Sequence, residues 1–167
     1  MDEPNPPART TSTPRRPDSV ERPGDAGSSG ASPQGGPAAD EAAAECARRR
    51  YHDARMTPVQ VGPEVQAMLE PNETVFAARH GVRFDSHELV ALDVAPGDAG
   101  DVYLTGRRLI FCGAMHLEVC LAEIREVILA GERLYLVTNS RGAIVMETDQ
   151  PRLLRVEIAA LRAAARR

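Results

Sequence analysis

The chain contains no lysine and no tryptophan, and all 20 of its Lys+Arg residues are arginines. Without lysine it has neither the P-loop lysine that holds a nucleotide phosphate nor a lysine that forms a Schiff base with a carbonyl substrate. Enzymes that depend on either group are therefore excluded. A lysine-free composition rich in alanine, arginine, proline and glycine is typical of a GC-rich bacterial genome.

Cysteines and long apolar runs are also scarce. Three cysteines, an odd number, do not make a disulfide framework. No stretch approaches the roughly 18 apolar residues that a membrane-spanning helix needs, and no apolar leader follows Met1. We therefore expect a cytoplasmic protein that has no transmembrane segment and whose contact with a membrane, if any, is peripheral.

The first 50 residues have few side chains able to form a core. Val20 is their single member of the Leu, Ile, Val and Phe group, whereas they hold eight of the 13 prolines and five of the 13 glycines. Such a segment cannot bury enough apolar surface to offset the entropy of ordering its backbone. The composition predicts a disordered Pro/Gly/Ser-rich tail over residues 1–38.

The charge balance gives no sign of a nucleic-acid partner. The formal net charge is -4, and residues 57–167 carry twelve arginines against fifteen acidic residues. A nucleic-acid-binding domain usually has a basic excess. We expect no nucleic-acid ligand.

Three helices are predicted. Residues 40–55 have an acidic start, an alanine-rich middle and an arginine-rich end, which matches the helix dipole at both ends and indicates a helical lead-in over 39–56. Its apolar face is mostly alanine, so we expect loose docking. A short helix begins at Pro63, and a terminal helix begins at Pro151 with Leu154, Ile158 and Leu161 on one face.

Between the last two helices, apolar residues alternate with a period of two, which is typical of half-buried strands. The candidate strands are residues 75–79, 88–94, 102–104, 109–112, 117–121, 124–129, 134–138 and 143–147. Their connections are short, as in a meander. Residues 57–167 are thus predicted to form one mainly β domain, an antiparallel barrel or bent sandwich of about seven strands capped by the C-terminal helix.

Two runs carry a family resemblance. Together with the terminal helix, Y-L-T-G-R-R-L-I-F at 103–111 and L-A-E-I-R-E-V at 121–127 resemble the bacterial PH-like and GRAM-like domains of the pleckstrin-homology superfold. The resemblance covers roughly residues 64–165. It implies a binding module, because members of this superfold bind phosphoinositide head groups, peptides or other proteins. In lipid-binding members, basic residues on the first hairpin hold phosphate, which here implies Arg79, His80, Arg83 and His87.

Four arginines are the candidate ligand-binding residues: Arg79, Arg83, Arg107 and Arg108. If the hairpins that carry them are neighbours, they form an anion-binding patch. The alternative, which we favour, is that they are solvated and pair with Glu118, Glu123 or Glu126 on adjacent strands.

Cys112, His116 and Cys120 are regularly spaced, but a structural zinc site normally has four ligands and no second cluster is present. We predict no metal site and no cofactor, with both cysteines buried as small apolar side chains.

Nothing in the sequence matches a nucleophile with a recognised base, so we predict that the protein is not an enzyme. The predicted function is a binding or adaptor module that recognises a protein or peptide at a sheet edge or in the groove beside the terminal helix. One alternative is peripheral binding of anionic membrane head groups through the arginine patch. An enzyme of unrecognised class is the second alternative.

Overall fold

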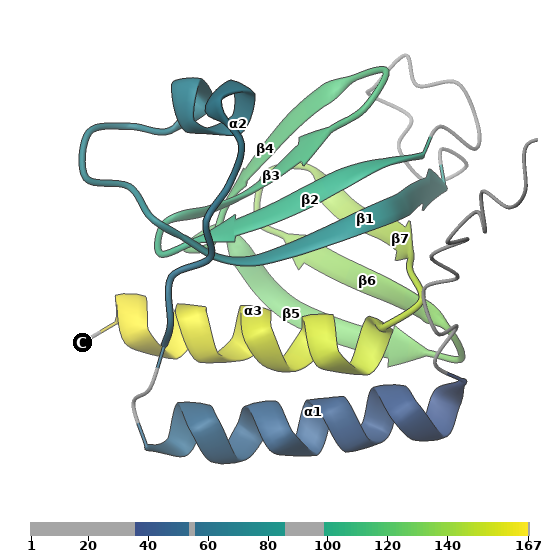
Figure 1. The fold of residues 1–167 in the computed structure, drawn as a ribbon. Helices are drawn as coiled ribbons and strands as arrows, with labels where there is room; N and C mark the ends of the chain where they lie inside the picture. The colour runs from purple at the N-terminus through teal and green to yellow at the C-terminus, as the bar shows by residue number, and fades with distance from the viewer. Residues whose placement is uncertain (1–35, 54–55, 86–98, 167) are drawn as a thin grey trace, which may run out of the picture. The chain divides into compact units, whose positions relative to one another are not determined.

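The computed structural model describes residues 36–53, 56–85 and 99–166 of the 167-residue chain (Figure 1). Residues 1–35 of the tail predicted over 1–38, the predicted strand at 88–94 and His87 lie outside these ranges. In chain order the elements are α1 (Pro37–His52), α2 (Pro63–Met68), β1 (Val75–Asp85), β2 (Ala99–Thr105), β3 (Arg108–Cys112), β4 (His116–Cys120), β5 (Ile124–Ala130), β6 (Arg133–Thr138), β7 (Gly142–Glu147) and α3 (Pro151–Ala165).

All seven strands of the described chain belong to one antiparallel sheet, in the order β4-β3-β2-β1-β7-β6-β5. β1 lies at its centre and joins two meanders, β1–β4 and β5–β7. The mainly β fold with a C-terminal helix is therefore confirmed. The sheet is bent, with α3 lying beside β5 and β6 (Figure 1), but β4 and β5 are unpaired edges, so it does not close into a barrel.

β1 is longer than the predicted strand at 75–79, because the strand continues through a β-bulge at Gly81 and does not end there. Gly81 has a φ of 66°, and the pairing register with β2 shifts between Arg79 and Val82. Glycine adopts positive φ without the steric penalty that other residues meet, and a bulge bends the strand. Beyond the bulge, Arg83 pairs with Glu147 of β7 as well as with β2. The bulge thus brings the two meanders into one sheet.

The main core lies between the inner face of the sheet and α3. Phe84 of β1 and Phe111 of β3 meet edge to face with ring centroids 4.3 Å apart. From α3, the predicted stripe of Leu154, Ile158 and Leu161 is buried in the same cluster. The helix is therefore fixed to the sheet by its apolar face, as its 3.6-residue period indicates.

α1 begins at Pro37, two residues before the predicted start of the helical lead-in at 39, and packs against α3. Its Ala44 and Ala47 are fully buried beside Leu153. The Gln150 side chain does not cap α3. Instead, buried Asp40 accepts hydrogen bonds from the backbone N–H groups of Arg152 and Leu153, at 2.9 and 3.0 Å. Because a carboxylate satisfies and stabilises a helix N-terminus, α1 is docked more firmly than its alanine face led us to expect.

Candidate binding site

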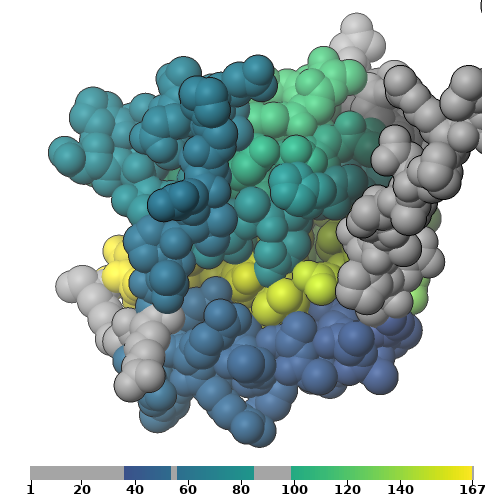
Figure 2. All heavy atoms as spheres, in the orientation of Figure 1, coloured from purple at the N-terminus to yellow at the C-terminus, as the bar shows by residue number. Residues whose placement is uncertain are grey.

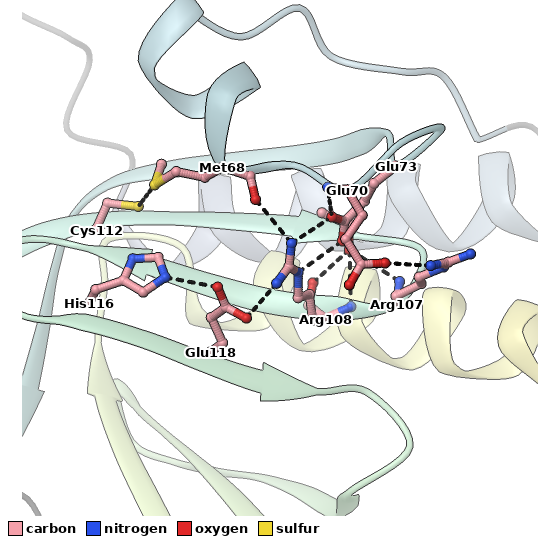
Figure 3. Close-up of polar contacts among 9 residues, drawn as sticks. Met68, Glu70, Glu73, Arg107, Arg108, Cys112, His116 and Glu118 are labelled. Atoms are coloured by element: carbon pink, nitrogen blue, oxygen red, sulfur yellow. Dashed lines mark hydrogen bonds and ion pairs between the residues drawn. The ribbon is translucent and has the colours of Figure 1, made fainter.

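Arg108 is the centre of a polar cluster that joins β3, β4 and the segment after α2 (Figure 3). Its Nε and Nη2 atoms donate to the two carboxylate oxygens of Glu73 at 3.1 and 2.8 Å, and Nη2 also donates to the Met68 carbonyl at 3.1 Å. Nη1 pairs with Glu118 on the neighbouring strand. The Arg108 side chain is only 17% exposed. Since four of its donor contacts are already made within the chain, Arg108 holds the fold together and is not presented to a ligand.

The same cluster determines the charge state of Glu73, whose side chain is 1% exposed. Burial alone would raise its pKa, but hydrogen bonds from Arg108, the Glu70 backbone N–H and the Thr105 hydroxyl lower the pKa of Glu73 to about 2. The pKa of Arg108 is raised, mainly by its hydrogen bonds with Glu73. Both groups stay charged at neutral pH, and the pair joins the segment after α2 to the β2–β3 turn.

Arg107, the next candidate, points to a different partner. Its Nη1 atom lies 2.6 Å from Oε2 of Glu70, and both side chains are largely exposed. The predicted pairing of these arginines with strand glutamates is therefore confirmed for Arg108 with Glu118, whereas Arg107 pairs with a residue of the α2–β1 connection.

Arg79 and Arg83 are both on β1, but their side chains have different environments. Arg79 forms an ion pair with Glu157 of α3, and both side chains are mostly buried. Arg83 is exposed, makes no ion pair with the residues that the structure describes, and lines an open polar cavity of about 600 Å³ together with Glu132 and Glu147. Of the four candidates, Arg83 is therefore the one whose guanidinium group forms no ion pair within the described residues.

The four arginines are not brought together. In the β1–β2 ladder, Val75 pairs with Thr105 next to Arg107, whereas Arg83 pairs with Ala99 at the other end. Eight residues of strand at about 3.3 Å each separate these ends by roughly 25 Å. The single arginine patch that would hold a head group is therefore not present in this arrangement.

The two cysteines of the β3–β4 hairpin lie at opposite ends of it. Cys112 pairs with His116 across the hairpin, while Cys120 lies opposite Arg108 at its other end. The prediction that Cys120 is buried is wrong, because it faces away from the core and is exposed. Cys112 is partly buried 3.8 Å from the Met68 sulfur, and this burial raises the pKa of its thiol. No group of three metal-binding side chains occurs within residues 36–53, 56–85 and 99–166.

An apolar groove runs between the C-terminal part of α1 and the middle of α3. The helices are parallel, because Asp40 near the start of α1 contacts Leu153 near the start of α3. The groove has a volume of about 490 Å³, and its lining consists of Arg48, Tyr51, His52, Arg155, Val156, Ala159 and Ala160. Every ionisable side chain on its rim, apart from the tyrosine, is an arginine or a histidine.

A groove beside the terminal helix was expected from the sequence, but the residues that line it were not. The signal was the pair of alanine-rich helix faces, since small side chains on two adjacent helices leave a shallow depression between them. The order of the charges along each helix can also be read from the sequence. The parallel arrangement of the two helices cannot. That arrangement places the arginine-rich end of α1 beside α3.

Comparisons with known proteins give no family for this chain. No protein-family model matches it, and no curated protein matches it. Among solved structures it is similar to the C-terminal domain of an unknown protein from Leishmania infantum, with 13% sequence identity, a TM-score of 0.41, and coverage of 62% of this chain and 88% of that chain. A likeness this weak carries no argument. None of the helices described here is long and apolar enough to cross a bilayer.

Proposed function

We propose that the protein is a non-catalytic binding module that recognises a partner protein through the groove between α1 and α3. The observation that carries this proposal is the combination of an apolar floor with a basic rim. Tyr51, Val156 and the adjacent alanines supply the floor, while Arg48 and Arg155 flank it. An amphipathic helix laid in a hydrophobic groove is a recurrent mode of peptide recognition.

The charges select the kind of partner. The chain has a net charge of -4, yet the groove is flanked by Arg48 and His52 near the end of α1, where the helix dipole is negative, and by Arg155 of α3. Arg48 already pairs with Glu41 and Glu45 of its own helix. Arg155 makes no ion pair within the described part of the chain. A partner helix with a narrow apolar face and acidic flanks complements this surface, because long-range attraction raises the rate of encounter and fixes the orientation.

The resemblance to bacterial PH-like and GRAM-like domains supports a binding role, because that superfold presents ligand surfaces on a sheet and its terminal helix. The competing function in the same superfold, binding of anionic head groups, has less support. Arg79, Arg107 and Arg108 each pair with a carboxylate, and Arg83 lies at the far end of β1.

A fluorescence-anisotropy titration of the full chain tests the proposal. The probe is a labelled amphipathic helical peptide with a leucine and alanine stripe flanked by glutamates, and the matched peptide carries lysines in place of the glutamates. We expect the acidic peptide to bind, with an affinity that falls as salt rises, and the basic peptide not to bind. Arg155→Glu should weaken binding at least tenfold, whereas Arg141→Glu, an equally exposed change in the β6–β7 turn, should leave it unchanged.

Two results would overturn the proposal. The first is equal binding of the acidic peptide to Arg155→Glu and Arg141→Glu, which would separate its binding from the groove. The second is no binding of either peptide together with sedimentation of the chain with anionic vesicles of phosphatidylglycerol, which would assign the basic surface to membranes.

A further inference from the structure

The exposed side of α1 carries a stripe of charged residues whose sign changes along the helix. Figure 2 shows α1 along the lower border of this face of the molecule, below the strip of α3. Glu41, Glu45, Arg48 and His52 follow one another at intervals of three or four residues, so they lie on one side of the helix. The exposed fractions of these four side chains run from 47% to 88%. The stripe is therefore acidic at its start, basic at its end, and accessible to a partner.

The basic half of the stripe is one wall of the groove, where Arg48 lies together with Arg155 and two alanines of α3. A helix that fits this groove brings small side chains to the alanines and carboxylates to the basic groups. Of the other described helices, α2 has only six residues, and the one acidic residue of α3, Glu157, is buried. The first half of α1 has the required character, because it exposes Ala42 next to Glu41.

A two-fold axis would satisfy both halves of the stripe at once. With α1 of a second copy lying antiparallel to α1 and the axis between residues 46 and 47, Glu45 meets Arg48 of the second copy. About the same axis, Glu41 meets His52 of the second copy. Symmetry repeats both contacts, because in such an interface residue i meets residue j and j meets i. A parallel arrangement would instead place carboxylates beside carboxylates, and like charges in contact oppose binding.

We propose that the helix held by the groove is α1 of a second copy of this chain, so that the protein forms a two-fold symmetric dimer. The inference rests on the function proposed above, in which the groove binds an acidic helix, and it names that helix. Glu45 of one copy would lie between Arg48 and Arg155 of the other, and Ala42 would lie over the alanines of α3. The apolar floor then supplies contact area, while the charges fix the direction of the helices.

The ion pairs that the stripe already makes are compatible with this arrangement. Arg48 contacts Glu41 and Glu45 at 3.1 Å, Arg49 contacts Glu45 at 3.3 Å, and Arg152 contacts Glu41 at 3.2 Å. Exposed pairs of this kind contribute little to stability, so their exchange for contacts between copies costs little. A carboxylate also has two oxygens that accept several hydrogen bonds, so Glu45 can keep its contact with Arg49 in the dimer.

The test measures the molar mass of the full chain by size-exclusion chromatography with light scattering over a range of concentrations. Glu41→Arg combined with Glu45→Arg makes the acidic half of the stripe basic, and Arg48→Glu combined with Arg155→Glu makes the basic side acidic. We expect the unaltered chain to dimerise and each double variant to have a dissociation constant about tenfold higher or more. An equal mixture of the two double variants should form the dimer again, because each arginine at the interface then meets a glutamate of the other copy.

Glu126→Arg combined with Glu132→Arg is the matched control. Both glutamates are exposed and lie outside α1, and the change in net charge equals that of the acidic-half variant. This control should dimerise as the unaltered chain does. Recovery of the dimer on mixing also separates the interface from folding defects, since an unfolded variant would not be restored by its counterpart.

The results distinguish this inference from the function on which it rests. A monomeric unaltered chain that binds the labelled acidic peptide, with the loss expected for Arg155→Glu, would overturn the inference and leave the proposed function standing. A monomeric chain that binds no peptide would overturn both. A dimer that persists in both double variants, or double variants that stay monomeric when mixed, would also overturn the inference, because the two halves of the stripe would then not meet in the dimer.

Discussion

Replacing Glu73 with glutamine should remove the charge that holds Arg108 while keeping the size of the side chain. In the folded protein the pKa of Glu73 is about 2, against an ordinary value of 4.5. Each pKa unit corresponds to about 1.4 kcal/mol, so the folded environment favours the ionised carboxylate by about 3 kcal/mol. We therefore expect Glu73→Gln to lower the free energy of unfolding by about 3 kcal/mol at pH 7, in the range measured for breaking a buried ion pair.

The effect should depend on pH in a defined direction. Because the pKa of Glu73 is lower in the folded protein, the unfolded chain binds a proton at this residue first as the pH falls. The stabilisation is therefore complete above about pH 5 and is lost progressively between about pH 4.5 and 2. Other carboxylates titrate in the same range, so the informative quantity is the difference between the unaltered chain and Glu73→Gln, measured by urea unfolding at each pH.

Glu70→Gln is the matched control, because Glu70 is on the same segment and pairs with Arg107 in an exposed position. An exposed pair contributes about 0–1 kcal/mol, so this variant should be nearly as stable as the unaltered chain at every pH. A difference between the unaltered chain and Glu73→Gln that stays constant from pH 7 to pH 2 would refute the reasoning, since the loss would then come from packing and not from the charge.

Three further substitutions test the fold through urea unfolding or thermal denaturation at pH 7. Asp40→Ala removes the carboxylate that caps α3 and should lower the free energy of unfolding by about 1–2 kcal/mol; no change would mean that α1 is not docked in solution. Leu154→Ala leaves a cavity in the main core and should cost about 2–5 kcal/mol, whereas a smaller loss would place the helix outside that core. Gly100→Ala puts a Cβ atom 2.5 Å from the Cys112 carbonyl oxygen and from the Phe111 ring, so it should lower the midpoint of thermal denaturation, and an unchanged midpoint would contradict this close approach of β2 and β3.

The elements that sequence analysis predicted well are those whose patterns are set by local physics. The terminal helix has a proline at its first position and apolar residues at helical spacing, and its buried face is the predicted one. β4 alternates as expected, with Leu117 and Val119 buried and Glu118 on the other face. In these segments the period of the apolar residues was enough to predict which side chains are buried, because one face of each element packs against the core.

The errors arise where the structure depends on distant residues. Gly81 looks like the end of a strand, and only pairing with both β2 and β7 makes it a bulge within one. Cys120 is a local exception: it was expected to be buried as a small apolar side chain, but it follows the alternation of β4 and lies on the outer face with Glu118. Arg107 and Arg108 are adjacent in the chain, yet Arg108 is enclosed by a glutamate 35 residues earlier, a contact that no local spacing signals.

The charge order of α1 has a consequence that follows only from its packing. In sequence, its acidic start and basic end match the helix dipole. In the fold, Asp40 and Glu41 contact Arg152 at the start of α3, so the acidic residues of this first turn are neutralised by the partner helix. Because α3 is parallel to α1, its Arg155 lies at the groove together with Arg48 and His52 of α1. The same docking that caps α3 therefore places Arg155, which makes no ion pair within the described residues, beside the apolar groove of a chain that is acidic as a whole.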